Sequence, residues 1–164
     1  MKRIVLSAIM LLGAFLFQSC DGGYIIDYAP IEITLSVQNN DGKDLLNPAT
    51  EGTLATEGTR LLYDGVYYDL NIEQSIAMNT RYYMPEFYGI KLSKDSLGYI
   101  LEIGEFDGAR DTEWTEMTIE WSDGTTDTFA YSRKVGGIGR HPRVKTKYYH
   151  NGDEMESSHI RLVK

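Results

Sequence analysis

The clearest pattern along this chain is a strict alternation of apolar and polar residues. Over residues 31–38 every odd position is apolar and every even position is polar. A period of two is typical of a β-strand with one buried face, because successive side chains point to opposite sides. The segment therefore predicts a strand whose odd positions face a core. The Asn-Asn-Asp-Gly sequence at residues 39–42 predicts the turn that ends it.

A second β-prone region is interrupted by a dipeptide typical of tight turns. The Asp-Gly dipeptide at residues 64–65 separates residues 60–63 from residues 66–70. Asp-Gly favours a two-residue hairpin because both central positions of that turn need positive φ. The pattern predicts a β-hairpin in which Tyr67 and Tyr68 point to opposite faces, so that one of them is exposed.

The rest of the chain carries further short β-prone segments between turn signals. These segments are residues 86–92, 97–103, 117–121, 128–132, 144–150 and 153–163. In the second of them, the spacing predicts that Leu97, Tyr99, Leu101 and Ile103 share one face. An Asn-Gly dipeptide separates the last two segments and predicts another hairpin. Residues 43–58 predict a long loop, and residues 71–81 predict a short helical turn.

These elements together predict an all-β protein with about eight or nine short strands. No long segment has the 3.6-residue period of an amphipathic helix. Regularly spaced strands and turn signals favour a single antiparallel β-sandwich, which could be immunoglobulin-like, with a small barrel as the alternative. The chain has one cysteine, so the Cys–Trp–Cys pattern of antibody domains is absent.

The amino terminus does not follow the strand pattern. Lys2 and Arg3 precede a nearly unbroken apolar run over residues 4–17. As a helix this run would be roughly 21 Å long. A bilayer core is about 30 Å thick, so the run is short for a membrane-spanning helix and typical of a secretory signal peptide.

The run ends at Phe17-Gln18-Ser19-Cys20, which resembles the lipobox of bacterial lipoproteins. That resemblance implies cleavage before Cys20 and acylation of the cysteine, palmitate included. It divides the chain into a signal peptide (1–19), a lipidated cysteine with a tether (20–30) and a β-sandwich domain (31–164). A lipidated Cys20 also accounts for an unpaired cysteine in an oxidising compartment.

The resemblance implies a location as well. The chain is expected in the bacterial cell envelope, lipid-anchored to a membrane, which we take to be the outer membrane; whether it faces the periplasm or the cell surface stays open. The chain as a whole looks like the small, acidic, tyrosine-rich β lipoproteins of Bacteroidota-type envelopes. That looser resemblance implies no site residues.

Charge argues against two classes of partner. Removal of residues 1–19 takes away two of the 16 basic residues and none of the 24 acidic ones, so the formal net charge changes from −8 to −10. Such a surface does not suit nucleic acid, which needs clustered Lys and Arg. It also argues against peripheral binding to anionic lipid, so the lipid anchor is expected to provide the membrane attachment. The one basic stretch contains Arg140, Arg143, Lys145 and Lys147, the last three on one strand face. It indicates a solvated face, with anion binding as the alternative.

The histidines do not predict a metal site. A two-residue turn at 151–152 pairs His150 with Asp153 and, in a continuous strand, His159 with Val144. The two histidines would then lie roughly 20 Å apart along the hairpin. They could not share an ion, and His141 alone does not make a site.

Other chemistry is weakly indicated. The chain has no Gly-x-Ser-x-Gly motif, and its one cysteine is expected to be acylated. Asx-rich loops at 39–44 and 107–111 offer oxygen ligands for calcium, but each is more simply a turn. Carboxylates that could serve a hydrolase are Glu102, Glu105, Asp107, Glu113, Glu116 and Glu120. We predict no enzyme activity, no cofactor and no metal.

Aromatic residues are the remaining signal for function. The candidate binding residues are Tyr82, Tyr83, Tyr88 and Trp114. Exposed rigid rings serve as anchors in protein interfaces or as stacking surfaces for sugars. The sequence therefore predicts a non-enzymatic binding or accessory module in an envelope protein complex, with a cell-surface glycan-binding module as the alternative. The same tyrosines could instead fill the rims of the sandwich.

Overall fold

The structure is a computed structural model that describes residues 28–71, 87–137 and 143–164. These residues form ten β-strands and no helix. The strands are β1 (Ile31–Gln38), β2 (Arg60–Tyr63), β3 (Val66–Asp69), β4 (Ile90–Lys94), β5 (Tyr99–Phe106), β6 (Thr112–Glu120), β7 (Thr126–Gly136), β8 (Arg143–His150), β9 (Asp153–Met155) and β10 (His159–Val163).

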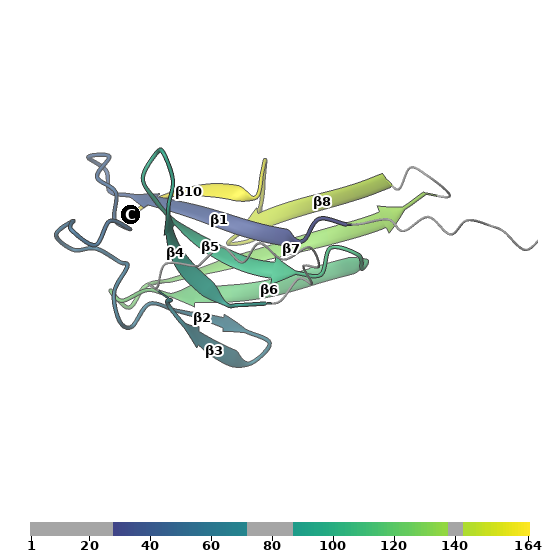
Figure 1. The fold of residues 1–164 in the computed structure, drawn as a ribbon, viewed down its shortest axis with the longest axis horizontal. Coiled ribbons are helices and arrows are strands. Elements are labelled where there is room, and N and C mark those ends of the chain that lie inside the picture. Colours follow the sequence, from purple (N-terminus) through teal and green to yellow (C-terminus); the bar gives the residue numbers. More distant parts are fainter. Residues whose placement is uncertain (1–27, 72–86, 138–142) are drawn as a thin grey trace, which may run out of the picture.

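The strands make two sheets that pack as a β-sandwich (Figure 1). One sheet has four strands in the order β10-β1-β5-β4, and the other has six in the order β3-β2-β6-β7-β8-β9. All neighbouring strands are antiparallel except β1 and β10, which are parallel. The predicted fold class is therefore confirmed, and the sheets do not close into a barrel.

The core lies between the inward faces of the two sheets. In β1 the burial pattern alternates without exception, and its four apolar residues are all at most 2% exposed. Met117, Ile119 and Trp121 supply the facing surface from the six-stranded sheet, together with Phe129. Each fully buried side chain of this size stabilises the fold by about 1.5–3 kcal/mol.

Both predicted two-residue hairpins are present. Asp64 and Gly65 have φ of 50° and 74°, and Asn151 and Gly152 have φ of 49° and 92°. Positive φ at both central positions is the condition for this turn, and Asn, Asp and Gly reach it at the lowest cost. The first turn joins β2 to β3 and the second joins β8 to β9.

The prediction of one continuous strand over 153–163 was wrong. His150 does pair with Asp153, but β9 ends at Met155 and the chain crosses to the other sheet. There β10 pairs with β1, and His159 lies opposite Thr34 instead of Val144. The crossing places Ile160 and Leu162 in the core, where they are 0% and 5% exposed.

The hairpin predicted from 86–92 and 97–103 lies further along the chain. Its strands are β4 and β5, joined by a turn at residues 95–98. The Asp95 carboxylate accepts the backbone N–H groups of Leu97 and Gly98, which holds Leu97 in the turn. Leu97 is 89% exposed, so it does not share the buried face of Leu101 and Ile103 as expected.

The loop predicted over 43–58 contains no strand, but it is more than a polar connection. Leu46 is fully buried, and Leu54 and Ala55 are 4% and 3% exposed. Thr59, just beyond the loop, donates its hydroxyl to the Leu54 carbonyl and accepts the Ser122 N–H. The loop therefore closes one end of the core.

Several predictions fall outside the described residues. These are the signal peptide, Cys20 and most of the tether, and all of the predicted helical turn except Asn71. Among the residues that the structure does describe, no helix has the length and hydropathy needed to span a membrane.

Candidate functional site

Aromatic side chains gather on the outer face of the six-stranded sheet. Trp114 on β6 is 49% exposed, and its ring centroid lies 4.7 Å from that of Tyr149 on β8. The indole N–H of Trp114 donates to the Glu116 carboxylate at 3.1 Å. These contacts fix the ring pair in one orientation, so an apolar surface with a polar edge is presented to solvent.

A third ring, that of Tyr67 on β3, lies on the same outer face. Tyr67 is 48% exposed and donates its hydroxyl to Glu120, which lies four residues after Glu116 on β6. The Arg60 guanidinium lies 4.0 Å from the centre of the Tyr67 ring and 2.7 Å from the Glu120 carboxylate. Hydrogen bonds from Arg60 and Tyr67 lower the pKa of Glu120 below its usual value. As predicted, Tyr68 points the other way and packs against the core.

The structure separates two of the predicted binding residues. Tyr88 lies by the four-stranded sheet, where its hydroxyl donates to Glu32 at 3.4 Å and the Lys91 ammonium lies 4.5 Å from its ring centre. Trp114 contacts Tyr149 and Glu116, which both belong to the six-stranded sheet. The two rings therefore do not form one platform. Tyr82 and Tyr83 lie outside the described residues.

Carboxylates surround Tyr88. Burial raises the pKa of Glu32, and the nearby Glu105 and Glu102 raise it further. Lys91 offsets part of this charge through its 2.7 Å ion pair with Glu102. Burial, followed by the same carboxylates, raises the pKa of Tyr88 far above its usual value. A carboxyl with a raised pKa is what a general acid needs, so a hydrolase hypothesis would begin at Glu32.

The histidines go to separate places. His150 on β8 lies 2.8 Å from the Asp127 carboxylate and stacks on Phe129 at 5.0 Å. His159 lies on β10 in the four-stranded sheet, 2.9 Å from the hydroxyl of Thr34 on the neighbouring strand β1. Within 28–71, 87–137 and 143–164, no group of three or more His, Cys, Asp or Glu side chains could hold a metal ion. His141 is outside those ranges.

Asp127 is a residue that the sequence reasoning missed. It is 8% exposed and accepts hydrogen bonds from Trp121 at 2.7 Å and from His150 at 2.8 Å, and the Lys164 ammonium lies 2.9 Å away. Burial alone would raise its pKa, but the hydrogen bonds from His150, Lys164 and Trp121 outweigh burial and lower it. The available signal was its spacing of two from Phe129, which puts a carboxylate on the inward face.

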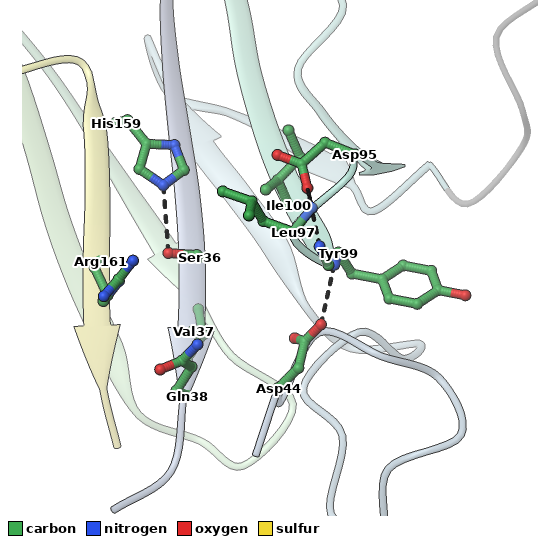
Figure 2. A pocket seen from close by; sticks show the side chains of 11 residues that line it. Ser36, Val37, Gln38, Asp44, Asp95, Leu97, Tyr99, Ile100, His159 and Arg161 are labelled. Atoms are coloured by element: carbon green, nitrogen blue, oxygen red, sulfur yellow. Dashed lines mark hydrogen bonds between the residues drawn. The ribbon is translucent and has the colours of Figure 1, made fainter. Parts of the chain in front are cut away.

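A small hollow lies on the outer face of the four-stranded sheet, between β10, β1 and the β4–β5 turn (Figure 2). Its volume is about 60 Å³, well below the 300–1,000 Å³ of sites for organic ligands. Asp95 and Asp44 at its rim accept backbone N–H groups, including that of Tyr99. These carboxylates stabilise turns, so the hollow suits water more than a ligand.

A larger hollow of about 310 Å³ lies at one end of the sandwich. Its walls include Tyr63, Phe87, Phe106 and Tyr131, whose rings pack on one another with centroids 4.6–5.3 Å apart. Glu105 lines the same hollow, and its Oε2 atom is buried without a hydrogen-bond partner among the described residues. The packed rings belong to the core, so the hollow is a shallow opening over it.

The loops considered for calcium use their oxygen atoms in turns. Asn39 accepts the N–H groups of Asp41 and Lys43, and Asp107 accepts that of Ala109. Such Asx turns are what Asn and Asp commonly form before glycine. These side chains therefore already have local partners.

Comparison with known proteins finds no match: no family model, no curated protein and no solved structure is similar to this chain.

Proposed function

We propose that this protein is a lipoprotein of the bacterial cell envelope, anchored through Cys20, that acts as a non-enzymatic binding module in a protein complex. One feature supports the anchor. Ser19-Cys20 follows an apolar run of signal-peptide length.

The observation that carries the binding role is the ring pair of Trp114 and Tyr149. Together with Tyr67 it gives the outer face of the six-stranded sheet three rings that are held by hydrogen bonds, ring contacts or an arginine. Aromatic residues are enriched where protein interfaces bury most of their surface. Rings that are already fixed lose little side-chain entropy on binding.

The anchor is tested by metabolic labelling with a palmitate analogue. We expect label on the wild-type chain and none on Cys20→Ala. Equal labelling of the two chains would disprove the anchor.

The binding role is tested by crosslinking in cells followed by purification of the anchored protein. We expect a partner at fixed stoichiometry with the wild type, and at least tenfold less of it with Trp114→Ala, since a central anchor residue contributes 2 kcal/mol or more. The matched control is Leu97→Ala, which removes an exposed apolar side chain from the other sheet. A partner recovered equally with both variants would place the interface elsewhere.

A glycan-binding module is the second candidate, and the exposed indole of Trp114 favours it. A sugar ring stacks on one flat ring, whereas the rings of Trp114 and Tyr149 are tilted by 45°. This tilt leaves Trp114 alone as the stacking surface. Glycan-array binding that Trp114→Ala abolishes would favour this candidate over the protein partner, and an array without binding would exclude it.

A further inference from the structure

The part of the β7–β8 hairpin from Ser132 to Asn151 carries positive charge alone, in a protein with an excess of acid. No Asp or Glu occurs between Ser132 and Asn151. The described residues of this region include Arg133, Lys134 and three more cations on β8. This stretch is therefore a cationic part of an acidic protein.

The strand register brings these cations onto one face. Lys134 lies directly opposite Lys145, and Gly136 lies opposite Arg143. Residues that face each other across an antiparallel ladder project to the same side, so Lys134, Arg143 and Lys145 share a face. Opposed like charges destabilise a hairpin, yet here they face solvent together.

These three cations have no carboxylate partner among the described residues. The next cation along the same face, Lys147, does have one, because its ammonium pairs with Glu154 on β9. The Asp111 carboxylate, which contacts β7 beside Lys134, accepts the backbone N–H of Val135. We call the segment formed by residues 134–136 and 143–145 the cationic arm.

The cationic arm lies at the end of the molecule where the chain enters the fold. The position that a Cβ on Gly108 would take is close to both the Ala29 carbonyl and the Arg133 guanidinium, so these two groups are neighbours. Figure 1 shows the start of β1 and the far ends of β7 and β8 at one end of the sandwich and the C-terminus at the other. The described chain therefore enters the fold at the base of the arm.

We propose that the cationic arm docks on anionic lipid headgroups of the membrane that carries the Cys20 anchor. This inference rests on the proposed function. The eight residue-to-residue steps from Cys20 to Tyr28 span at most roughly 28 Å, so the anchor holds the arm within reach of the headgroups. The acidic remainder is repelled by the same surface, so the arm and the anchor together set the orientation of the domain.

The physical basis is two weak attachments that act together. Each Lys or Arg at an anionic surface strengthens binding about fivefold, and the effect falls off within a Debye length of roughly 8–10 Å. A basic patch beside an acyl chain is a known route to stable attachment.

The test supplies the anchor chemically, so that its result is independent of acylation in cells. Residues 20–164 are coupled through Cys20 to a maleimide lipid in vesicles of phosphatidylcholine, with or without phosphatidylglycerol. Hydrogen exchange of residues 134–136 and 143–145 is then measured. We expect slower exchange only on phosphatidylglycerol vesicles, with the protection lost at high salt.

The decisive variant is the triple substitution Lys134→Gln, Arg143→Gln and Lys145→Gln. It should shift the docking equilibrium on the order of 100-fold and remove the protection. The matched control is the triple substitution Lys43→Gln, Lys94→Gln and Arg161→Gln. It changes the net charge by the same amount at exposed residues outside the arm, so the protection of the arm should remain. The proposal would be overturned if the arm showed no protection, or if the protection persisted in the arm triple. It would also be overturned if the protection depended on the density of protein on the vesicles instead of on phosphatidylglycerol. A docked arm in a chain that cells do not acylate would support the affinity of the arm for anionic headgroups and would disprove the Cys20 anchor.

Discussion

The charged side chains at the two ends of β7 have opposite surroundings. At its start, the buried carboxylate of Asp127 meets Trp121, His150 and Lys164. At its far end, Lys134 faces Lys145 without a carboxylate partner among the described residues. A charge surrounded by partners inside the protein contributes to stability, whereas an exposed charge without them contributes little and stays available for binding. The comparison predicts different consequences for substitutions at the two ends.

The largest effect is expected from Asp127→Ala. It leaves the buried Trp121 N–H without its acceptor and the Lys164 ammonium without its carboxylate partner, so the free energy of unfolding should fall by about 3–5 kcal/mol. Urea unfolding measures the difference. The exposed Asp153→Ala is the control, expected within about 0.5 kcal/mol of wild type. Equal losses in the two variants would contradict the structural role of Asp127.

Substitution of a lysine by methionine near each end of β7 tests whether the two ends differ in their contribution to stability. Lys164→Met removes a donor from a buried carboxylate and should cost about 1.5–3 kcal/mol. Lys134→Met should change the free energy of unfolding by less than about 0.5 kcal/mol. Thermal unfolding of the two variants side by side tests this. A smaller loss of stability for Lys164→Met than for Lys134→Met would contradict the stabilising role of the charges around Asp127.

Acid should weaken the Asp127 end selectively. Its pKa is lower in the folded protein than the unfolded value of about 3.9, so its contribution is present above that value and is lost as the pH falls through the folded pKa. Glu32 acts in the opposite sense, because its raised pKa favours the folded state at low pH. Unfolding of wild type and Asp127→Asn between about pH 5 and pH 2 should show a shallower loss in the variant. An unchanged slope would mean that other carboxylates dominate acid unfolding.

The smallest effect is expected from Lys145→Glu. It converts the opposed pair with Lys134 into one of unlike charge, which should stabilise the hairpin by about 0.2–1 kcal/mol. The same change should weaken vesicle docking of the cationic arm. A variant that is more stable yet docks less well would show that the like-charge pair costs stability, and a destabilised variant would contradict the register argument.

Local patterns were enough for local structure. The alternation in β1 is enough to predict the bounds and the buried face of the strand, because a half-buried strand shows the same period of two in its burial. The Asp-Gly and Asn-Gly turns give two registers, since the positive φ values that they favour determine which residues face each other. The opposite faces of Tyr67 and Tyr68 follow from the same geometry.

Non-local pairing was beyond the sequence pattern. The alternation that buries Ile160 and Leu162 is equally compatible with either sheet, so it could not reveal that β10 crosses to β1. Arg143 and Lys145 were visible in the basic stretch, but Lys134 was not, because only the strand register shows that it lies opposite Lys145. The separation of Tyr88 from Trp114 likewise depends on the assignment of strands to sheets.

The parallel pairing of β1 and β10 has a mechanical consequence. The described chain enters at the start of β1 and ends just beyond β10, at opposite ends of the molecule (Figure 1). A pulling force between Tyr28 and Lys164 would therefore run along these two strands. Their five paired positions, Thr34–Gln38 with His159–Val163, would have to shear together instead of opening one at a time. A domain held at one end and loaded at the other would resist extension through its terminal strands.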